Sequence, residues 1–127
     1  MPFDFPTDAQ QRGLANYHAG LAAESSVELE YQTAGAILLE RRWRGAAGEV
    51  DIILRDGDEL VFVEVKKSKS FARAAESLSQ RQLGRISLAA EEFLGTQDLG
   101  SLTPMRIDVA LTNATGEVDI LRNVTGF

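Results

Sequence analysis

Gly48-Glu-Val-Asp-Ile-Ile-Leu54 and Leu60-Val-Phe-Val-Glu-Val-Lys66 are the two stretches from which the architecture of this chain is best worked out. Both are rich in β-branched residues, and the Asp56-Gly57 pair between them is typical of a tight turn. They therefore predict a β-hairpin. If Asp56-Gly57 forms a two-residue loop, Ile53 faces Leu60 on the neighbouring strand.

This register places three charged side chains on one face of the hairpin. Asp51 faces Phe62, so Asp51 and Glu64 are diagonal neighbours about 5–8 Å apart at Cβ. Lys66 follows Glu64 on the same face. Burying three charged groups among apolar side chains is costly unless something compensates them.

The chemistry of these three groups points to a metal site. Two carboxylates and a backbone carbonyl suit Mg²⁺ or Mn²⁺. A lysine beside the cation can hold an attacking water and neutralise a developing phosphorane charge. The pattern therefore predicts metal-assisted phosphodiester hydrolysis. The alternative is an outward-facing ladder of salt bridges on a half-exposed hairpin.

The segment before the hairpin predicts a helix and then a strand. From Asp8 to about Ala34, apolar residues recur at three- and four-residue steps, and Gly35 marks the end of the helix. Glu24 lies at the edge of this apolar face, where an acid is unexpected unless it points at the same site. Residues 36–43 predict the strand.

The segment after the hairpin predicts one long helix from Ala72 to Leu94. Gln82 falls within its apolar stripe and Arg85 at the edge, so both side chains should point toward the sheet. Either Gln82 is a structural amide with satisfied hydrogen bonds, or the two residues support the site or contact a phosphate.

Two further strands complete the expected architecture, at residues 106–111 and 117–121. The order α-β-β-β-α-β-β predicts a single α/β sandwich that spans residues 1–127. A chain of 127 residues with 44% hydrophobic and 25% charged side chains is long enough for one such core.

The chain contains no cysteine and a single histidine, His18. These counts exclude disulfide scaffolds, thiolate zinc sites and cysteine nucleophiles, and leave carboxylates, lysine and arginine for chemistry. The N-terminus lacks a basic segment followed by an apolar run, and no apolar stretch is long enough to span a bilayer. We therefore expect a cytoplasmic protein.

The net charge of −6 is unevenly distributed along the chain. Residues 1–40 and 86–127 carry net charges of −5 and −4, whereas residues 41–85 carry +3. A negative total argues against binding to nucleic acid, but the basic middle segment allows a focused positive patch. The alternative is that these basic side chains are ordinary solvated surface.

The motifs resemble a known nuclease superfamily. Three segments are similar to the PD-(D/E)xK pattern. They are the acid after Ala23, the Gly48-Glu-Val-Asp51 opening of one strand and the Phe62-to-Lys66 stretch of the next. More narrowly, the chain looks like the bacterial YraN-like family, which is similar to archaeal Holliday junction resolvases. Arg106-Ile-Asp108 resembles that family's Arg-Phe-Asp strand.

This resemblance covers about residues 15–124. It implies a restriction-endonuclease-like three-layer sandwich in which a central mixed β-sheet is flanked by helices. Residues 1–7 are expected to be loosely ordered.

Carried over residue by residue, the resemblance assigns roles to the hairpin. It implies that Asp51 and Glu64 are metal ligands, that Lys66 is the catalytic lysine and that the Val65 carbonyl is a further ligand. Glu24 becomes a helix-borne catalytic acid near the metal. Glu49 also matches the motif, with a less defined supporting role.

The chain departs from the family at positions expected to contact DNA. Gln82 stands where many relatives have lysine, and Lys67-Ser-Lys69 replaces an aromatic residue and an arginine. We expect DNA contacts from the positions that follow the strand and from the facing helix, namely Lys67, Lys69, Arg73, Gln82 and Arg85.

The resulting expectation is a Mg²⁺- or Mn²⁺-dependent nuclease that acts on branched or otherwise structured DNA, since no base-reading module is visible. A homodimer would suit cleavage of two strands. The alternative is a non-catalytic nucleic-acid-binding or scaffold protein that retains the fold.

Overall fold

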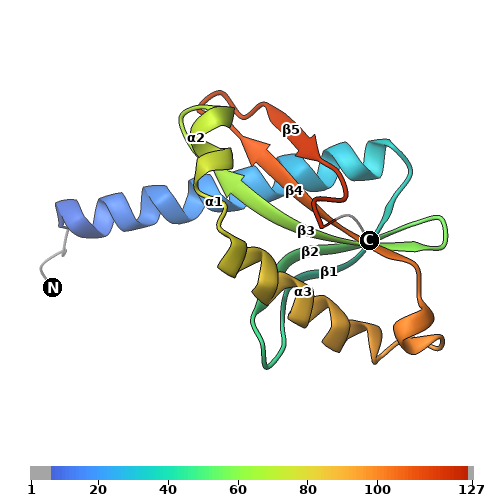
Figure 1. Ribbon diagram of the computed structural model, residues 1–127. Coiled ribbons are helices and arrows are strands. Elements are labelled where there is room, and N and C mark those ends of the chain that lie inside the picture. Colours follow the sequence, from blue (N-terminus) through green and yellow to red (C-terminus); the bar gives the residue numbers. More distant parts are fainter. Residues whose placement is uncertain (1–6, 126–127) are drawn as a thin grey trace, which may run out of the picture.

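A computed structural model of the protein describes residues 7–125 (Figure 1). Thr7 is the N-cap of the first helix, and the other residues expected to be loosely ordered, 1–6, lie outside the described part. The elements are α1 (Asp8–Thr33), β1 (Ile37–Arg44), β2 (Glu49–Asp56), β3 (Glu59–Lys67), α2 (Phe71–Glu76), α3 (Gln80–Leu94), the 3₁₀ turn η1 (Gly100–Leu102), β4 (Met105–Thr112) and β5 (Val118–Leu121).

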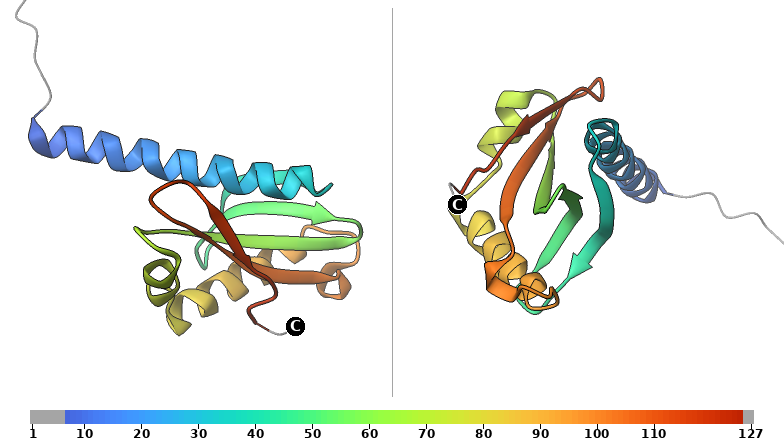
Figure 2. Two further views of the ribbon diagram at one scale, coloured as in Figure 1. Left: turned by 90° about the horizontal axis from the view of Figure 1, so that it is seen from above. Right: turned by 90° about the vertical axis from the view of Figure 1, so that its right-hand side faces the viewer.

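The five strands form one mixed sheet in the order β1-β2-β3-β4-β5. Strands β3 and β4 are parallel and joined by a crossover through α2 and α3, whereas all other neighbours are antiparallel. Helix α1 covers one face of the sheet, and α2 and α3 cover the other (Figure 2). The predicted three-layer sandwich with a central mixed sheet is therefore confirmed.

The alternation of side chains along β2 and β3 supplies a core on each face of the sheet. Ile53 and Phe62 pack against α3, where Phe93 makes an edge-to-face contact with Phe62 at 5.7 Å between ring centroids. On the other face, Val63 belongs to the cluster that includes Val27 of α1. The central strands are therefore buried on both sides.

The hairpin register differs from the predicted one by two residues. Ile53 pairs with Phe62, not with Leu60, and Asp56 pairs with Glu59. The loop is therefore Gly57-Asp58, with Gly57 at φ +62°. A two-residue turn with glycine in its first position matches the twist of the strands, as the expected Asp56-Gly57 turn also would.

The predicted helix 72–94 is wrong in one respect, because it is divided into α2 and α3. The Ser77 hydroxyl donates to the carbonyl of Ala74 at 2.6 Å in the last turn of α2. Ser79 then caps α3: its hydroxyl accepts from the Gln82 N–H at 3.1 Å, and the Gln82 side chain accepts from the Ser79 N–H at 3.3 Å. Serine side chains compete with helical hydrogen bonds in this way and favour helix ends.

A buried polar network fastens α1 to β4. Asp108 is fully buried, and its carboxylate accepts from the Tyr31 hydroxyl at 2.7 Å and from the Asn123 N–H at 2.9 Å. Arg106 supplies the compensating positive charge at 3.2 Å and also bonds to Glu59 at 2.6 Å. The Arg-Ile-Asp motif of β4 thus stabilises the contact between α1 and the sheet, at the end of the sheet where β3 begins.

Helix α1 is longer than the sheet that it covers. Its first turns extend past the sheet on the side where β3 ends (Figures 1 and 2). Ala23 is its first buried residue among those whose side chains are described. Its C-terminal half carries the residues packed on the sheet.

Candidate active site

The candidate site lies where β2 and β3 separate. Their regular pairing runs from the hairpin loop to the Ile52–Val63 pair. At the next position, the Asp51 side chain, not a backbone carbonyl, accepts from the Val65 N–H at 2.8 Å. The N–H and C=O of a strand residue point to the same neighbour, so the Val65 carbonyl faces the same gap.

Asp51 and Glu64 form a pair of carboxyl groups close enough to share a proton. Burial raises the pKa of Asp51, whereas the Val65 N–H and the neighbouring Glu64 and Lys66 oppose the rise. Burial likewise raises the pKa of Glu64 to about 8, and the negative charge of Asp51 adds to this shift. At neutral pH the Asp51–Glu64 pair is therefore partly protonated unless a cation compensates its negative charge.

Lys66 provides one compensating charge. Its ammonium lies 3.7 Å from the Glu64 carboxylate, and only 14% of its side chain is exposed. The structure thus brings Asp51, Glu64 and Lys66 together on the face of the sheet that α3 covers. The predicted register was wrong by two residues, but the prediction that these three side chains share a face is unaffected, because side chains alternate with a period of two.

Glu24 approaches the pair from α1 but has a partner of its own. Its carboxylate accepts from the Arg42 guanidinium of β1 at 3.1 Å. Burial raises the pKa of Glu24, Arg42 opposes the rise, and the charges of Asp51 and Glu49 add to it. The charges of the site therefore act on Glu24. Among the described residues, however, Glu24, Asp51 and Glu64 do not form one group of three carboxylates that could hold a metal ion.

A hollow of about 270 Å³ opens beside the carboxyl pair, between α3 and the loop that joins β1 to β2. Gln82 and Arg85 of α3 line it, as predicted from their positions on the helix, together with Glu49 and Glu64. The side-chain oxygen of Gln82 also accepts from the Ser79 N–H in the capping box of α3, so the interpretation as a structural amide holds for this oxygen. The remaining lining residues are Ala47, Gly48 and Ile86.

The loop at the rim of this hollow is pinned to α3. Both oxygens of the Glu92 carboxylate accept from the Ala46 N–H, at 2.9 and 3.1 Å. A β-carbon at Gly45 would collide with this carboxylate and with the Trp43 ring, so a larger residue there would force these side chains to shift. Glu92 and Gly45 were not found from the sequence, because the contact joins residues 46 positions apart.

The other predicted DNA contacts lie away from the hollow. Lys67 points to the opposite face of the sheet from Lys66, where it lines a hollow of about 190 Å³ beside Ala19 of α1. Lys69 follows β3, and Arg73 lies in α2; both are exposed.

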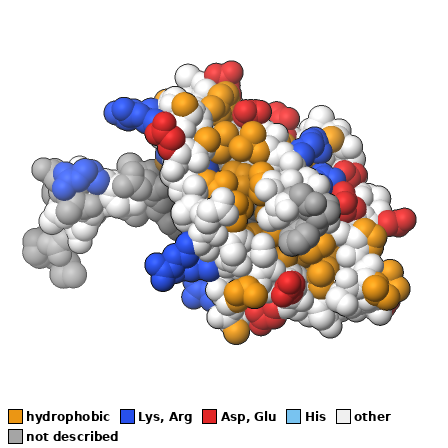
Figure 3. Space-filling view, in the orientation of Figure 1, with side chains coloured by type: hydrophobic (Ala, Val, Ile, Leu, Met, Phe, Trp, Pro, Cys, Tyr) orange, Lys and Arg blue, Asp and Glu red, His pale blue; other side chains and the backbone are white. Residues whose placement is uncertain are grey.

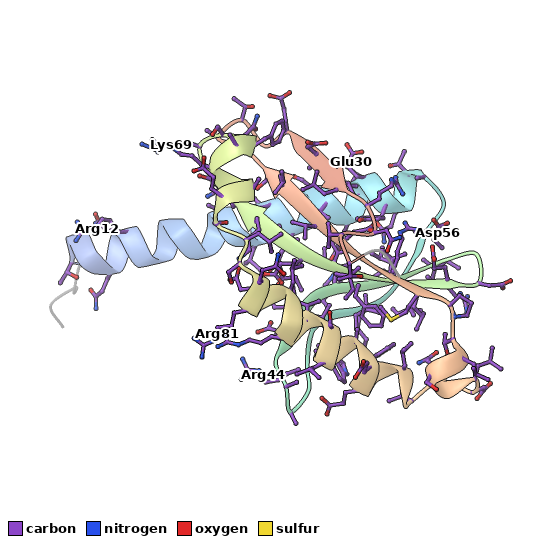
Figure 4. All side chains as sticks on the ribbon, in the orientation of Figure 1. Arg12, Glu30, Arg44, Asp56, Lys69 and Arg81 are labelled. Carbon is purple, nitrogen blue, oxygen red and sulfur yellow. The ribbon has the colours of Figure 1, made fainter. Side chains whose placement is uncertain are left out.

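Further basic side chains lie near the start of α3 and near α2 (Figure 4). Figure 4 labels Arg81 near the start of α3, Arg44 below it in this view and Lys69 near α2. The space-filling view shows basic side chains at two places on this face, with an acidic side chain beside the upper one (Figure 3). Arg44 also pairs with Glu49 across β1 and β2, at 3.5 Å.

The donor set fits a hard divalent cation. Asp51, Glu64 and the Val65 carbonyl could supply oxygen ligands, and Mg²⁺ keeps several waters and needs few protein ligands. Within the described part of the chain, no three acidic or histidine side chains cluster as a complete protein-only metal centre. Substrate and water oxygens would complete the coordination of such a cation.

The three layers and the mixed five-stranded sheet are consistent with a nuclease-like sandwich. The model of the "Uncharacterised protein family UPF0102" matches residues 23–112, which include Glu24, both hairpin strands and all of α3. The chain belongs to this family, also called the YraN family.

Similar curated proteins agree with this assignment. A UPF0102 protein of Ruegeria pomeroyi is 56% identical over 115 residues, covering 91% of this chain and 94% of the relative. UPF0102 proteins of Roseobacter denitrificans and Cereibacter sphaeroides are 52% and 51% identical over 111 residues, covering 87% of this chain and 86% and 95% of those relatives. Among residues 7–125, no helix combines the length and hydropathy needed to span a membrane.

Proposed function

We propose that this protein is a divalent-metal-dependent nuclease that hydrolyses phosphodiester bonds in branched or otherwise structured DNA. The observation that carries the proposal is the buried Asp51–Glu64 pair with Lys66 beside it, at the point where β2 and β3 separate. An arrangement kept only for stability would not need two adjacent buried carboxyl groups, because each makes the other's charged form less stable.

The proposed roles follow from position. Asp51, Glu64 and the Val65 carbonyl hold Mg²⁺ or Mn²⁺, which when bound supplies a Lewis acid for the scissile phosphate. Lys66 orients the attacking water and stabilises the negative charge that develops on the phosphoryl oxygens. Glu24, as a helix-borne acid at the edge of the site, adds negative potential that favours the cation.

Substrate binding is proposed to rely on phosphates. Arg85 and Gln82 line the hollow beside Glu64, and an arginine there can form paired hydrogen bonds with a phosphate group. The exposed Lys69 and Arg73 extend the positive surface toward α2. Such contacts position a nucleic acid without reading its bases, which supports recognition of DNA shape.

A second candidate function is non-catalytic binding of nucleic acid. It is favoured by the net charge of −6 and by the engagement of Gln82 in the capping box of α3, at a position where a cation would contact phosphate. Under this alternative, the protein binds branched DNA and leaves it intact.

The deciding experiment measures cleavage of four-way junction, flap and linear duplex DNA with Mn²⁺, with Mg²⁺ and with a chelator. We expect metal-dependent cutting by the wild type, and a loss of at least about 100-fold in Lys66→Ala and Asp51→Asn. Arg55→Ala, an exposed change toward the other end of β2, serves as the matched control. Junction binding without cleavage under any of these conditions would favour the scaffold alternative.

Two further parts of the proposal concern context. We place the protein in the cytoplasm, which suits a chain without cysteine. We also propose that a homodimer acts on two strands, which sedimentation with and without junction DNA would test.

A further inference from the structure

Two consecutive arginines of β1 bond to the same helix. The Arg41 guanidinium donates to Glu28 at 2.7 Å, and the Arg42 guanidinium donates to Glu24 at 3.1 Å. Glu24 and Glu28 are four residues apart and so lie one above the other on α1. Neighbouring residues of a regular strand point to opposite faces, so this shared direction requires a break in the strand.

The break is at Arg42 itself. Its φ of +50° lies in the left-handed region, which is unfavourable for a residue with a long side chain. The pairs Arg41–Ile52 and Trp43–Val50 place Arg42 opposite Asp51 in the β1–β2 register. The irregular residue therefore stands beside the proposed catalytic carboxylate.

The ion pair alone does not explain why this backbone conformation is kept. The side chains of Arg42 and Glu24 are 40% and 20% exposed, and ion pairs of this kind contribute little stability. A left-handed arginine costs at least as much free energy as such a pair contributes. One consequence of the pair is the direction in which it holds the Glu24 side chain.

The charges around Glu24 favour an orientation away from the site. The negative charges of Asp51 and Glu49 both act on Glu24, so its ionised side chain is repelled by the region that it faces. The side chain also lies at the edge of the contact between α1 and the sheet, where it could turn toward water. An arginine opposite Asp51 supplies attraction in the required direction.

We propose that Arg42 is a positioning residue that uses its left-handed backbone to hold Glu24 of α1 toward the Asp51 end of the site. Its effect on catalysis rests on the proposed nuclease function, whereas its effect on the Glu24 side chain does not. Arg41, which pairs with Glu28 further along α1, has no such role.

The first test uses the metal-free protein. Scalar couplings measured by NMR report whether the Glu24 side chain holds one rotamer. We expect one rotamer in the wild type, in Arg42→Lys and in the control Arg41→Ala, and averaged rotamers in Arg42→Gly. Glycine is the replacement of choice because it adopts a positive φ freely. A single, unchanged Glu24 rotamer in Arg42→Gly overturns the proposal, whether or not the protein cuts DNA.

The second test is a double-mutant cycle on metal-dependent junction cleavage. We expect Arg42→Gly to lower kcat at least 10-fold, Arg42→Lys to recover most of the loss, and Arg41→Ala to match the wild type. If Arg42 acts through Glu24, the double variant Arg42→Gly/Glu24→Ala is no slower than Glu24→Ala alone.

The two tests separate the proposals. Additive losses in the cycle, or an Arg42→Gly variant as active as the wild type, overturn the positioning role and leave the nuclease function standing. A wild type that neither binds Mn²⁺ nor cuts removes the nuclease function, and the rotamer measurement still decides the role of Arg42.

Discussion

Replacing Glu64 with glutamine should stabilise the metal-free protein increasingly as the pH rises. In the unfolded chain this carboxyl group titrates near its ordinary pKa of 4.5, whereas burial and Asp51 raise the pKa to about 8 in the folded state. Between these values the folded protein binds a proton that the unfolded chain does not. Stability must therefore fall with rising pH across this window and level off above it. Glutamine keeps the shape of the side chain and removes the titration.

The size of the effect follows from the shift in pKa. Each unit corresponds to about 1.4 kcal/mol, so the full shift would amount to about 5 kcal/mol. Relaxation of the pair and access of water to Glu64, whose side chain is 18% exposed, reduce this figure, and we expect about 2–3 kcal/mol at pH 8. For a chain of this length, that corresponds to a rise in Tm of roughly 6–12 °C relative to the wild type.

The assay is urea unfolding of the metal-free wild type and Glu64→Gln at intervals from pH 4.5 to 8.5. Glu40→Gln, an exposed change of the same kind on β1, is the control and should parallel the wild type. Adding Mn²⁺ at ten times its dissociation constant should restore about 1.4 kcal/mol to the wild type and nothing to Glu64→Gln. Parallel stability curves for wild type and Glu64→Gln would refute the argument that burial and Asp51 hold a proton on this pair.

Two further predictions concern the supports of the fold. Tyr31→Phe removes the hydroxyl that donates to the buried Asp108 carboxylate, and we expect a loss of about 1–3 kcal/mol in urea unfolding with the metal-dependence of activity retained. Gly45→Ala forces the Glu92 carboxylate off the Ala46 N–H, and we expect a loss of about 1–2 kcal/mol together with weaker junction binding. A Gly45→Ala protein as stable as the wild type would show that the loop is not pinned.

The sequence was sufficient to place Asp51 and Glu64 on one face, because that inference needs only the alternation of side chains. It was not sufficient to locate the turn. Asp56-Gly57 and Gly57-Asp58 are both acceptable two-residue loops, and the choice between them shifts the register by two. The pairing of the whole sheet, which no local pattern contains, makes that choice.

Two other features differ in whether the sequence alone indicates them. The break between α2 and α3 has a local signal, Ser79 followed three residues later by Gln82, which the long apolar stripe outweighed. The left-handed conformation of Arg42 has no local signal, because arginine does not favour it. It is a property of the folded β1 strand, so it could be found only in the folded molecule.

The projecting turns of α1 make the protein convenient for optical work. The chain has no cysteine, so one introduced thiol can carry a fluorophore at a single known place. Gln10 is exposed on those turns, on the side where β3 ends, and Asp58 is exposed in the hairpin loop at the other end of that strand. A dye at position 10 should change its emission when DNA occupies the site, and a dye at position 58 should not. A dye on the projecting turns of α1 would then report DNA binding in real time while every charged residue of the site is left unchanged.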